Sequence, residues 1–155
     1  MELDQILPNL YVGSYPRYDD IDTLRRYGIT AVLNVQSDED FKFLGLDWTE
    51  MRARYFALGI EVRRVPILDF NDDDLCDKIP AAMQALGELV DEQHTVLVHC
   101  NAGANRSPSV VIAWLACDQA WSLDEAERHV TKCHRCAPVM EVVRRAADDW
   151  KRSAS

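Results

Sequence analysis

The chain has 155 residues, enough for one domain with a sizeable core, so we expect residues 1–155 to form a single domain. Its 48% hydrophobic and 28% charged residues are typical of soluble globular proteins, and no apolar run approaches the roughly 20 residues of a membrane span. A net charge of −9 argues against nucleic acid or an anionic membrane as the main partner. The acidic N-terminus lacks the basic region of a secretory signal, which predicts a cytoplasmic protein with reduced cysteines.

Strands and helices are expected to alternate over the first two thirds of the chain. Apolar or β-branched runs predict four strands, at residues 10–14, 29–36, 60–67 and 95–100. Capped helical patterns predict helices between them, at residues 19–28, 47–58 and 78–93, with an acidic loop at 68–76. This alternation is typical of an α/β fold.

Three helical patterns fill the last third, at residues 107–120, 122–133 and 138–150. The first is apolar nearly throughout, which predicts a buried helix. We therefore expect one α/β domain whose central, mostly parallel sheet is flanked by helices. Ligands of such sheets bind beyond the carboxyl ends of the strands, and Cys100 ends the strand expected to be central.

The sequence VLVHCNAGANRSPSVVIAWL, residues 96–115, joins that strand to the buried helix through a loop of small residues. Backbone N–H groups of such a loop can form a nest for an anion, and the N-terminus of the following helix adds partial positive charge. Gly103 lets an oxyanion approach the backbone, and the guanidinium of Arg106 fits two phosphate oxygens. The pattern predicts phosphate binding by Asn101, Ala102, Gly103, Ala104, Asn105 and Arg106.

Cys100 is the expected nucleophile. A helix N-terminus and a nearby cation favour the thiolate form of a cysteine, so we expect Cys100 to be ionised at neutral pH and to attack phosphorus. A buried, inert thiol accounts for Cys100 alone, but not for Gly103 and Arg106 at this spacing. We expect no metal and no organic cofactor, because the loop amides and Arg106 supply the positive charge.

The residues beside this motif each have two interpretations. His99 supports the loop or tunes the thiolate by hydrogen bonding, or it is a satisfied core histidine. Ser107 donates a hydrogen bond to the sulfur and helps it leave in a second step, or it is a helix N-cap.

A phosphomonoester also needs a proton on its leaving oxygen, which a carboxylic acid near the same sheet edge can supply. The stretch LDFNDDDL offers Asp69 between Leu68 and Phe70, whose apolar side chains favour the protonated form of the carboxyl group. Asp69 is therefore the predicted general acid and Asp72 the alternative. A solvated acidic turn is the remaining interpretation of this stretch.

Cys133 and Cys136 form a lone CxxC motif. A zinc site would need two further ligands, and no second pair is present, so two cysteines carried by a helix are the simpler interpretation. A redox role for this pair, or for Cys76 as the partner of an oxidised Cys100, stays open.

The stretch HCNAGANRS, residues 99–107, resembles the His-Cys-x5-Arg-Ser/Thr signature of the cysteine-dependent protein tyrosine phosphatases, most closely that of the dual-specificity branch. The segments ILPNLYVGSYP and VPILDF are similar to the family's opening strand and acid loop, so the likeness spans nearly the whole chain. It implies a dual-specificity-phosphatase-like fold and hydrolysis of phosphomonoesters through a cysteinyl-phosphate. It also implies the roles of Cys100 as nucleophile, Asp69 as general acid, Arg106 as phosphate-binding residue and Ser107 as the hydroxyl that assists breakdown of the intermediate.

Residues 41–75 and 136–150 also resemble plant phosphoglucan phosphatases, which hold glucan chains with aromatic residues. This likeness implies glucan contacts from Phe70, Trp48, Tyr55 and Phe41, with packing in the core or at its rim as the alternative for each. Asn105 departs from the glycine that those enzymes tend to carry before the arginine. The expected partner is therefore a phosphorylated protein or, as the alternative, a phosphoglucan.

Two other function classes use a similar loop. A catalytically silent phosphate-binding module would keep Arg106 but lack a usable nucleophile or acid, whereas both Cys100 and Asp69 are present. Sulfur transfer or arsenate reduction also uses a Cys-x5-Arg loop, but the acid loop and the implied strand order disfavour it. The physiological substrate and the oligomeric state cannot be read from the sequence.

Overall fold

Five short strands form one sheet in the order β1-β2-β5-β3-β4 in the computed structural model, which describes residues 1–154. The strands are β1 (Leu3–Leu7), β2 (Leu10–Gly13), β3 (Ala31–Asn34), β4 (Glu61–Arg64) and β5 (Val96–His99). Strand β1 is antiparallel to β2, and the pairs β2–β5, β5–β3 and β3–β4 are parallel. The strand that leads into Cys100 is therefore central, as predicted.

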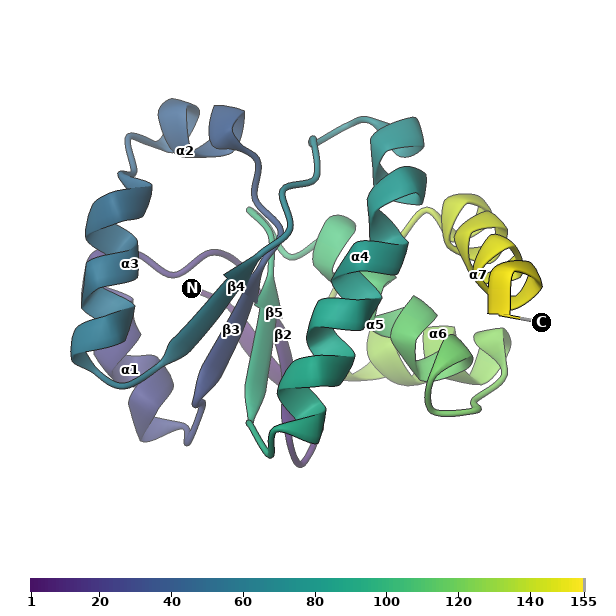
Figure 1. Cartoon of the computed structure of the whole chain (residues 1–155), viewed down its shortest axis with the longest axis horizontal. Helices are drawn as coiled ribbons and strands as arrows, with labels where there is room; N and C mark the ends of the chain where they lie inside the picture. The colour runs from purple at the N-terminus through teal and green to yellow at the C-terminus, as the bar shows by residue number, and fades with distance from the viewer. Residues whose placement is uncertain (155) are drawn as a thin grey trace.

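Helices cover both faces of this sheet (Figure 1). One face carries α1 (Ile21–Arg26) and α3 (Trp48–Ala57). The other carries α4 (Asp72–Asp91), α5 (Arg106–Cys117), α6 (Leu123–Cys133) and α7 (Met140–Ala154). A short 3-10 helix (Tyr18–Asp20) precedes α1, and α2 (Asp38–Leu44) follows β3. The α/β fold with a mostly parallel sheet is confirmed.

The strands build two cores because successive side chains of a strand point to opposite faces. Val32 of β3 and Leu97 of β5 belong to the cluster with α1 and α3. Their neighbours Leu33 and Val98 belong to the larger cluster under α4 to α7. The three inner strands β2, β3 and β5 are thus buried on both sides, which explains their continuous apolar runs in the sequence, whereas the edge strand β4 is partly exposed.

Helix α5 is the buried helix that the apolar pattern predicts. Every residue from Arg106 to Ala116 is buried, and Trp114 is 1% exposed. Helices α6 and α7 pack on it and α7 also contacts α4, so these outer helices hold α5, and the loop before it, against the sheet.

Three features of the fold differ from the sequence-based prediction. Strand β1 was not predicted, because this edge strand is partly exposed and has an irregular register between Gln5 and Leu7. Helix α2 was not predicted either, although Ser37 and Asp40 form a capping box at its start. Helix α4 begins at Asp72 rather than at residue 78, because the side chain of Asn71 caps it by accepting a hydrogen bond from the Asp74 amide.

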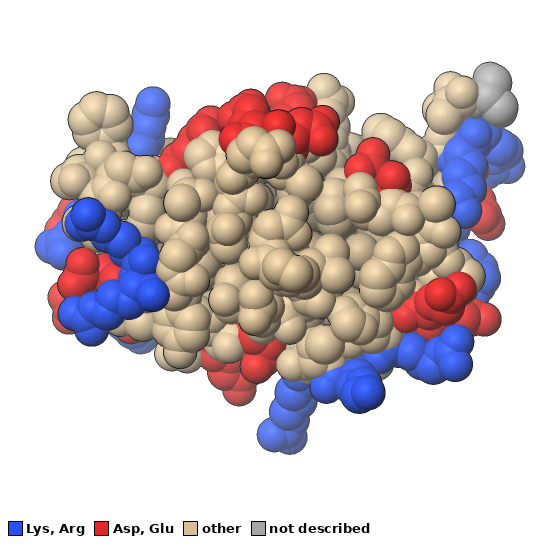
Figure 2. All heavy atoms as spheres, turned by 90° about the horizontal axis from the view of Figure 1, so that it is seen from below, with Lys and Arg blue, Asp and Glu red and all other residues tan. Residues whose placement is uncertain are grey.

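Figure 2 shows the molecule from the end at which the parallel strands begin. Charged side chains lie mainly around the border of this face and leave a broad central area without Lys, Arg, Asp or Glu. Among residues 1–154, no helix is both long and apolar enough to cross a lipid bilayer.

Candidate active site

The predicted anion-binding segment forms a loop, residues Cys100–Arg106, between the end of β5 and the start of α5 (the 100–106 loop). Three of its carbonyl groups are held by residues that are distant in the sequence. The carbonyl of Asn101 accepts a hydrogen bond from the Tyr15 amide (2.9 Å), and that of Ala104 accepts one from the Ala137 amide (2.7 Å). The third carbonyl, that of Gly103, lies 2.7 Å from Nε2 of His134.

These anchors decide where the loop amides point. In a trans peptide the N–H of the next residue points away from the carbonyl, and the chain has no cis peptide bond among its described residues. The amides of Ala102, Ala104 and Asn105 are therefore directed away from the anchoring groups. These amides and the N-terminus of α5 are the donors to which the sequence-based prediction assigns an anion.

Gly103 is required by this geometry. Its φ of +71° lies in the left-handed region, and a Cβ atom there would lie 2.8 Å from the carbonyl oxygen of Gly13. The 100–106 loop can therefore rest directly on the end of β2 only with glycine at this position.

Cys100 is 3% exposed, and its Sγ lies 3.2 Å from Oγ of Ser107. Ser107 is buried and is the second residue of α5, where Asn105 holds the N-cap position. The N-cap interpretation of Ser107 is therefore wrong, and its hydroxyl is within hydrogen-bonding distance of the sulfur.

Asn101 and Asn105 connect the ends of the 100–106 loop to their surroundings. Oδ1 of Asn101 accepts a hydrogen bond from Nε2 of Gln36 (2.8 Å). Oδ1 of Asn105 accepts one from the Val139 amide (3.0 Å) and one from Oγ of Ser109 (3.1 Å). Both amides thus hold the loop through Oδ1.

The guanidinium of Arg106 is 2% exposed and is held by three groups from other segments. Nη1 donates to Oδ2 of Asp40 (2.6 Å) and to the carbonyl of Ile67 (2.8 Å). Nη2 lies 3.2 Å from Oδ2 of Asp69. Arg106 is therefore fixed at the loop mainly through Nη1, while Nη2 lies beside Asp69.

Asp40 is a site residue that the sequence-based prediction missed. Its Oδ2 also accepts a hydrogen bond from the Ser37 amide at 2.8 Å, which closes the capping box of α2. Burial alone would raise the pKa of Asp40, but the hydrogen bonds from Arg106 and Ser37 and the charge of Arg106 outweigh burial and hold this pKa below its ordinary value. The spacing Ser37-x-x-Asp40 is the sequence signal that identifies the cap, though not its contact with Arg106.

Asp69 comes to the 100–106 loop through its contact with Arg106, and its side chain is 32% exposed. Asp72, the alternative acid, is the first residue of α4 and lines the groove described below. The backbone before Asp69 is held by Asp74, whose Oδ2 accepts a hydrogen bond from the Leu68 amide (2.8 Å). That bond lowers the pKa of Asp74; burial opposes it, and the hydrogen bond and charge of Lys78 add to the lowering.

His99 is fully buried at the end of β5. Its Nδ1 donates to the Cys100 carbonyl (3.0 Å), while Nε2 has no hydrogen-bond partner among residues 1–154. Burial lowers the pKa of His99 to about 4; the hydrogen bond to Cys100 opposes this shift and the charge of Arg106 adds to it. The neutral ring thus holds the backbone of Cys100, which agrees with the loop-supporting interpretation.

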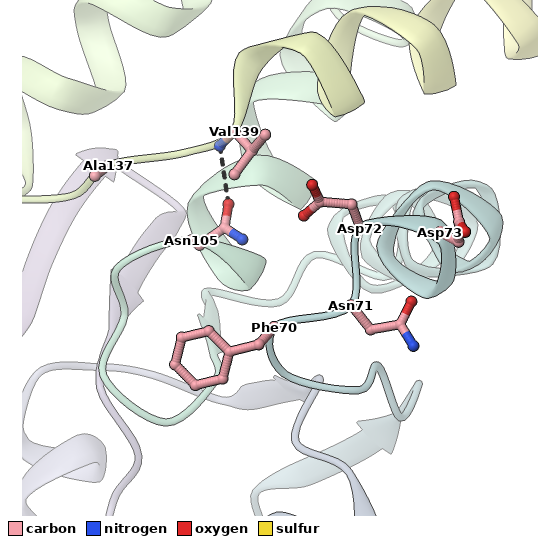
Figure 3. Close-up of a pocket in the computed structure, with 7 residues that line it drawn as sticks. All are labelled: Phe70, Asn71, Asp72, Asp73, Asn105, Ala137 and Val139. Atoms are coloured by element: carbon pink, nitrogen blue, oxygen red, sulfur yellow. Dashed lines mark hydrogen bonds between the residues drawn. The ribbon is translucent and has the colours of Figure 1, made fainter.

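An open groove of about 590 Å³ runs beside the 100–106 loop (Figure 3). It is lined by residues of the acid loop, of the start of α4, of the 100–106 loop and of the segment before α7: Phe70, Asn71, Asp72, Asp73, Asn105, Ala137 and Val139. The ring of Phe70 is 98% exposed, and its backbone has a φ of +55°. This is the one aromatic side chain among the groove residues.

Two of the other three aromatic residues named for glucan contact are in the core, so that expectation is wrong for them. Tyr55 is 0% exposed, and burial raises its pKa, with a smaller contribution from the charge of Asp20. Phe41 is 5% exposed and packs edge-on against Trp48, and the guanidinium of Arg64 lies over both rings. Trp48 thus belongs to a packed cluster away from the groove residues.

Cys133 and Cys136, like Cys76, Cys100 and Cys117, form no disulfide among the described residues. Within residues 1–154, one group of three His, Cys, Asp or Glu side chains has metal-ligand spacing, and it consists of Glu61, Glu92 and His94. The CxxC motif is not part of it. Cys76 lies 3.4 Å from Nε of Arg145.

Comparison with known proteins agrees with this geometry. Residues 10–144 match the family described as dual specificity phosphatase, catalytic domain. The chain is 31% identical over 148 residues to the phosphoglucan phosphatase DSP4, amyloplastic, of Castanea sativa, which covers 93% of this chain and 39% of that protein. It is 35% identical over 111 residues to human dual specificity protein phosphatase 12, which covers 72% of this chain and 30% of that protein. The chain thus spans less than half the length of these two relatives.

The fold is also similar to that of the human tyrosine phosphatase-like serine/threonine/tyrosine-interacting protein. The TM-score is 0.78 at 20% sequence identity, and the match covers 99% of this chain and 98% of the other. Since the family match extends over most of the sequence and the 100–106 loop has the geometry described above, the chain belongs to the dual specificity phosphatase family.

Proposed function

We propose that this chain hydrolyses phosphomonoesters, including those of phosphorylated proteins, through a cysteinyl-phosphate on Cys100. The observation that carries the proposal is the convergence on one loop of a thiol 3.2 Å from a hydroxyl, a buried arginine, and a carboxylate 3.2 Å from that arginine. The amides of the 100–106 loop and Arg106 would bind the three non-bridging phosphoryl oxygens and stabilise the charge that develops on them.

In the first step the Cys100 thiolate forms a bond to phosphorus while the bond to the leaving oxygen breaks. Asp69 donates a proton to that oxygen. The free protein holds the Asp69 carboxylate against Arg106. A bound phosphate dianion would take over Nη2 of Arg106 and free the Asp69 side chain to face the leaving oxygen.

In the second step a water molecule forms a bond to phosphorus and the bond to sulfur breaks. Asp69, now ionised, takes a proton from that water. The hydroxyl of Ser107, 3.2 Å from the sulfur, donates to the departing thiolate. This returns Cys100 to its starting form and releases inorganic phosphate.

Cys100→Ser is the first test. We expect it to reduce turnover of para-nitrophenyl phosphate below detection, while inorganic phosphate still binds in calorimetry. Cys117→Ser, at the far end of the same helix α5, is the matched control and should retain full activity. Substantial hydrolysis by the Cys100→Ser protein would exclude the nucleophile assignment.

The acid is tested in the same assay. Asp69→Asn should lower kcat by about 100-fold, in the range of general acid catalysis, and Asp72→Asn should leave kcat nearly unchanged. The reverse result would assign the acid to Asp72. A wild-type protein that binds phosphate but shows no turnover would be a phosphate-binding module rather than an enzyme.

A phosphoglucan is the second candidate substrate, favoured by the exposed ring of Phe70 beside the groove and by the 31% identity to a phosphoglucan phosphatase. A flat aromatic ring can stack on the apolar face of a sugar. Phe70→Ala should then slow hydrolysis of solubilised phosphoglucan and leave para-nitrophenyl phosphate unaffected. Equal rates of wild type and variant on phosphoglucan would remove the role of Phe70, and no hydrolysis of phosphoglucan by the wild type would remove this candidate.

A further inference from the structure

His134, the C-cap residue that follows α6, carries a polar ring into the protein core. The whole residue is 1% exposed and its side chain is 0% exposed. Its Nε2 lies 2.7 Å from the carbonyl oxygen of Gly103, and its Nδ1 lies 2.7 Å from Oδ2 of Asp4 on strand β1. The ring thus joins the 100–106 loop to the edge of the sheet.

Both partners of this ring are acceptors. A backbone carbonyl cannot donate a hydrogen bond, and neither can an ionised carboxylate. The two 2.7 Å contacts are therefore both hydrogen bonds when each ring nitrogen carries a proton, with the charge of the ring balanced by Asp4. In this state Asp4 fixes the orientation of the ring, and the ring keeps an N–H directed at the loop.

The bond to Gly103 has a consequence for the next peptide group. Because the carbonyl of Gly103 faces His134, the amide of Ala104 faces the opposite side, where the proposed function places the phosphoryl group. The space between Gly103 and the ring is small, since a Cβ atom on Gly103 would lie 3.1 Å from Nε2 of His134. Glycine has easy access to several backbone conformations, so a peptide at Gly103 needs an external group to keep one orientation.

We propose that His134, oriented by Asp4, is a positioning residue of the phosphatase site: its hydrogen bond to the Gly103 carbonyl keeps the Ala104 amide directed at the phosphoryl oxygens of the substrate. The inference rests on the proposed function of the 100–106 loop. It assigns no contact between His134 and the substrate.

The test compares two substitutions of His134 with opposite properties. His134→Phe keeps the ring volume and removes the donor, whereas His134→Gln keeps an N–H donor and fills the site less well. We expect kcat for para-nitrophenyl phosphate to fall about 10- to 100-fold in His134→Phe, somewhat less than the loss of a whole oxyanion donor, and to fall less in His134→Gln. A purely structural ring would give the opposite order, because phenylalanine would fill the core better than glutamine.

His129→Phe is the matched control. His129 lies on the same helix, and its Nε2 donates to the Ile6 carbonyl at 2.7 Å, so it makes the same kind of bond to β1 without touching the 100–106 loop. Its kcat should stay within about 2-fold of wild type. Thermal unfolding of all variants identifies any loss that comes from a smaller folded fraction.

Calorimetry measures the affinity of each variant for inorganic phosphate. Combining each variant with Cys100→Ser removes turnover, so that the affinity reports on the hydrogen-bond donors of the loop alone. We expect weaker phosphate binding in His134→Phe than in His134→Gln, and a smaller loss in Asp4→Ala, which leaves the donor but frees its orientation. If His134→Phe does not fold, Asp4→Ala provides the test, because the side chain of Asp4 is about half exposed and is easier to replace than the buried ring. Wild-type kcat and phosphate affinity in a folded His134→Phe or Asp4→Ala protein would overturn this inference alone, whereas a wild-type protein without phosphatase activity would overturn the proposed function.

Discussion

Arg106 and Arg63 each contact several carboxylates or carbonyls, but the two arginines differ in burial. Arg106 is 2% exposed, and its partner Asp40 has a side chain that is 10% exposed. Arg63, on the edge strand β4, has a side chain that is 26% exposed and reaches Glu88 and Glu92 (both 2.8 Å), whose side chains are about half exposed. Water screens the second cluster far more than the first.

The comparison distinguishes the buried cluster around Arg106, which holds one guanidinium in a fixed position, from the exposed cluster around Arg63 on the protein surface. Removing one partner of a buried pair leaves an uncompensated charge in the core, whereas removing one partner of an exposed pair leaves a charge that water solvates. The cluster around Arg106 is also directed: Nη1 is fully used, and Nη2 faces Asp69. Burial and direction together fix the guanidinium at the 100–106 loop, where the proposed function places the phosphoryl group.

Asp40→Asn should give the largest effect on stability. The substitution removes the buried anionic partner of Arg106 and leaves only the more exposed Asp69 beside Nη2, so we expect the free energy of unfolding at pH 7 to fall by about 3–5 kcal/mol. The matched control is Asp38→Asn on the same helix α2. Its carboxylate pairs with Arg64 at 2.6 Å but is 89% exposed, so its loss should cost less than about 1 kcal/mol in urea unfolding.

The pH dependence of the same pair sharpens this prediction. Because the pKa of Asp40 is lowered in the folded protein, its contribution to stability is complete above the pKa of the unfolded carboxyl group and is lost as pH falls through the folded pKa. The difference between wild type and Asp40→Asn should therefore persist from pH 7 to about pH 4, near the ordinary Asp pKa, and shrink below it. Equal losses for Asp38→Asn and Asp40→Asn would show that burial does not distinguish the two pairs.

His99, which is buried like Arg106 and Asp40, should give the second largest effect on stability. Its pKa falls from 6.5 to about 4 on folding, so the folded protein binds this proton more weakly than the unfolded chain. Stability should be complete above pH 6.5 and should decrease as pH falls from 6.5 toward 4, by up to about 3 kcal/mol. His99→Asn, which can still donate to the Cys100 carbonyl but cannot titrate, should lose this part of the slope. An unchanged slope in urea titrations between pH 4 and pH 7 would contradict the buried neutral ring.

Much of the site could be predicted because it is contiguous. The 100–106 loop and Ser107 stand within eight residues, and their types fit one purpose, the binding of an anion beside a thiol. Asp69 could be predicted because it follows an apolar strand, and the ends of parallel strands meet at one edge of the sheet. The same local patterns gave the central position of β5 and the helices α4 to α7, apart from the start of α4.

The residues that the prediction missed act across long sequence distances. Asp40 meets Arg106 across 66 positions, and Asp4 meets His134 across 130. Neither pair has a sequence pattern of its own. The local sequence indicates only that Asp40 belongs to the cap of a short helix, and that His134 stands between the two cysteines of the CxxC motif. Strand β1 was missed for a related reason, since an edge strand is defined by its partner and not by a regular alternation of its own residues.

Arg63→Gln should have the smallest effect. The substitution removes the cation shared by three carboxylates but leaves them exposed to water, so we expect the free energy of unfolding to fall by less than about 1 kcal/mol at physiological salt. The loss should shrink further at about 1 M salt, where the Debye length is near 3 Å and the residual repulsion of Glu61, Glu88 and Glu92 is screened. The Asp40→Asn loss should stay nearly constant over the same range, because its pair is buried. Urea unfolding of both variants at low and high salt therefore distinguishes the two clusters. Exposed ion pairs contribute at most about 1 kcal/mol. A salt-independent loss above about 2 kcal/mol in Arg63→Gln would therefore show that the edge cluster behaves like the buried one.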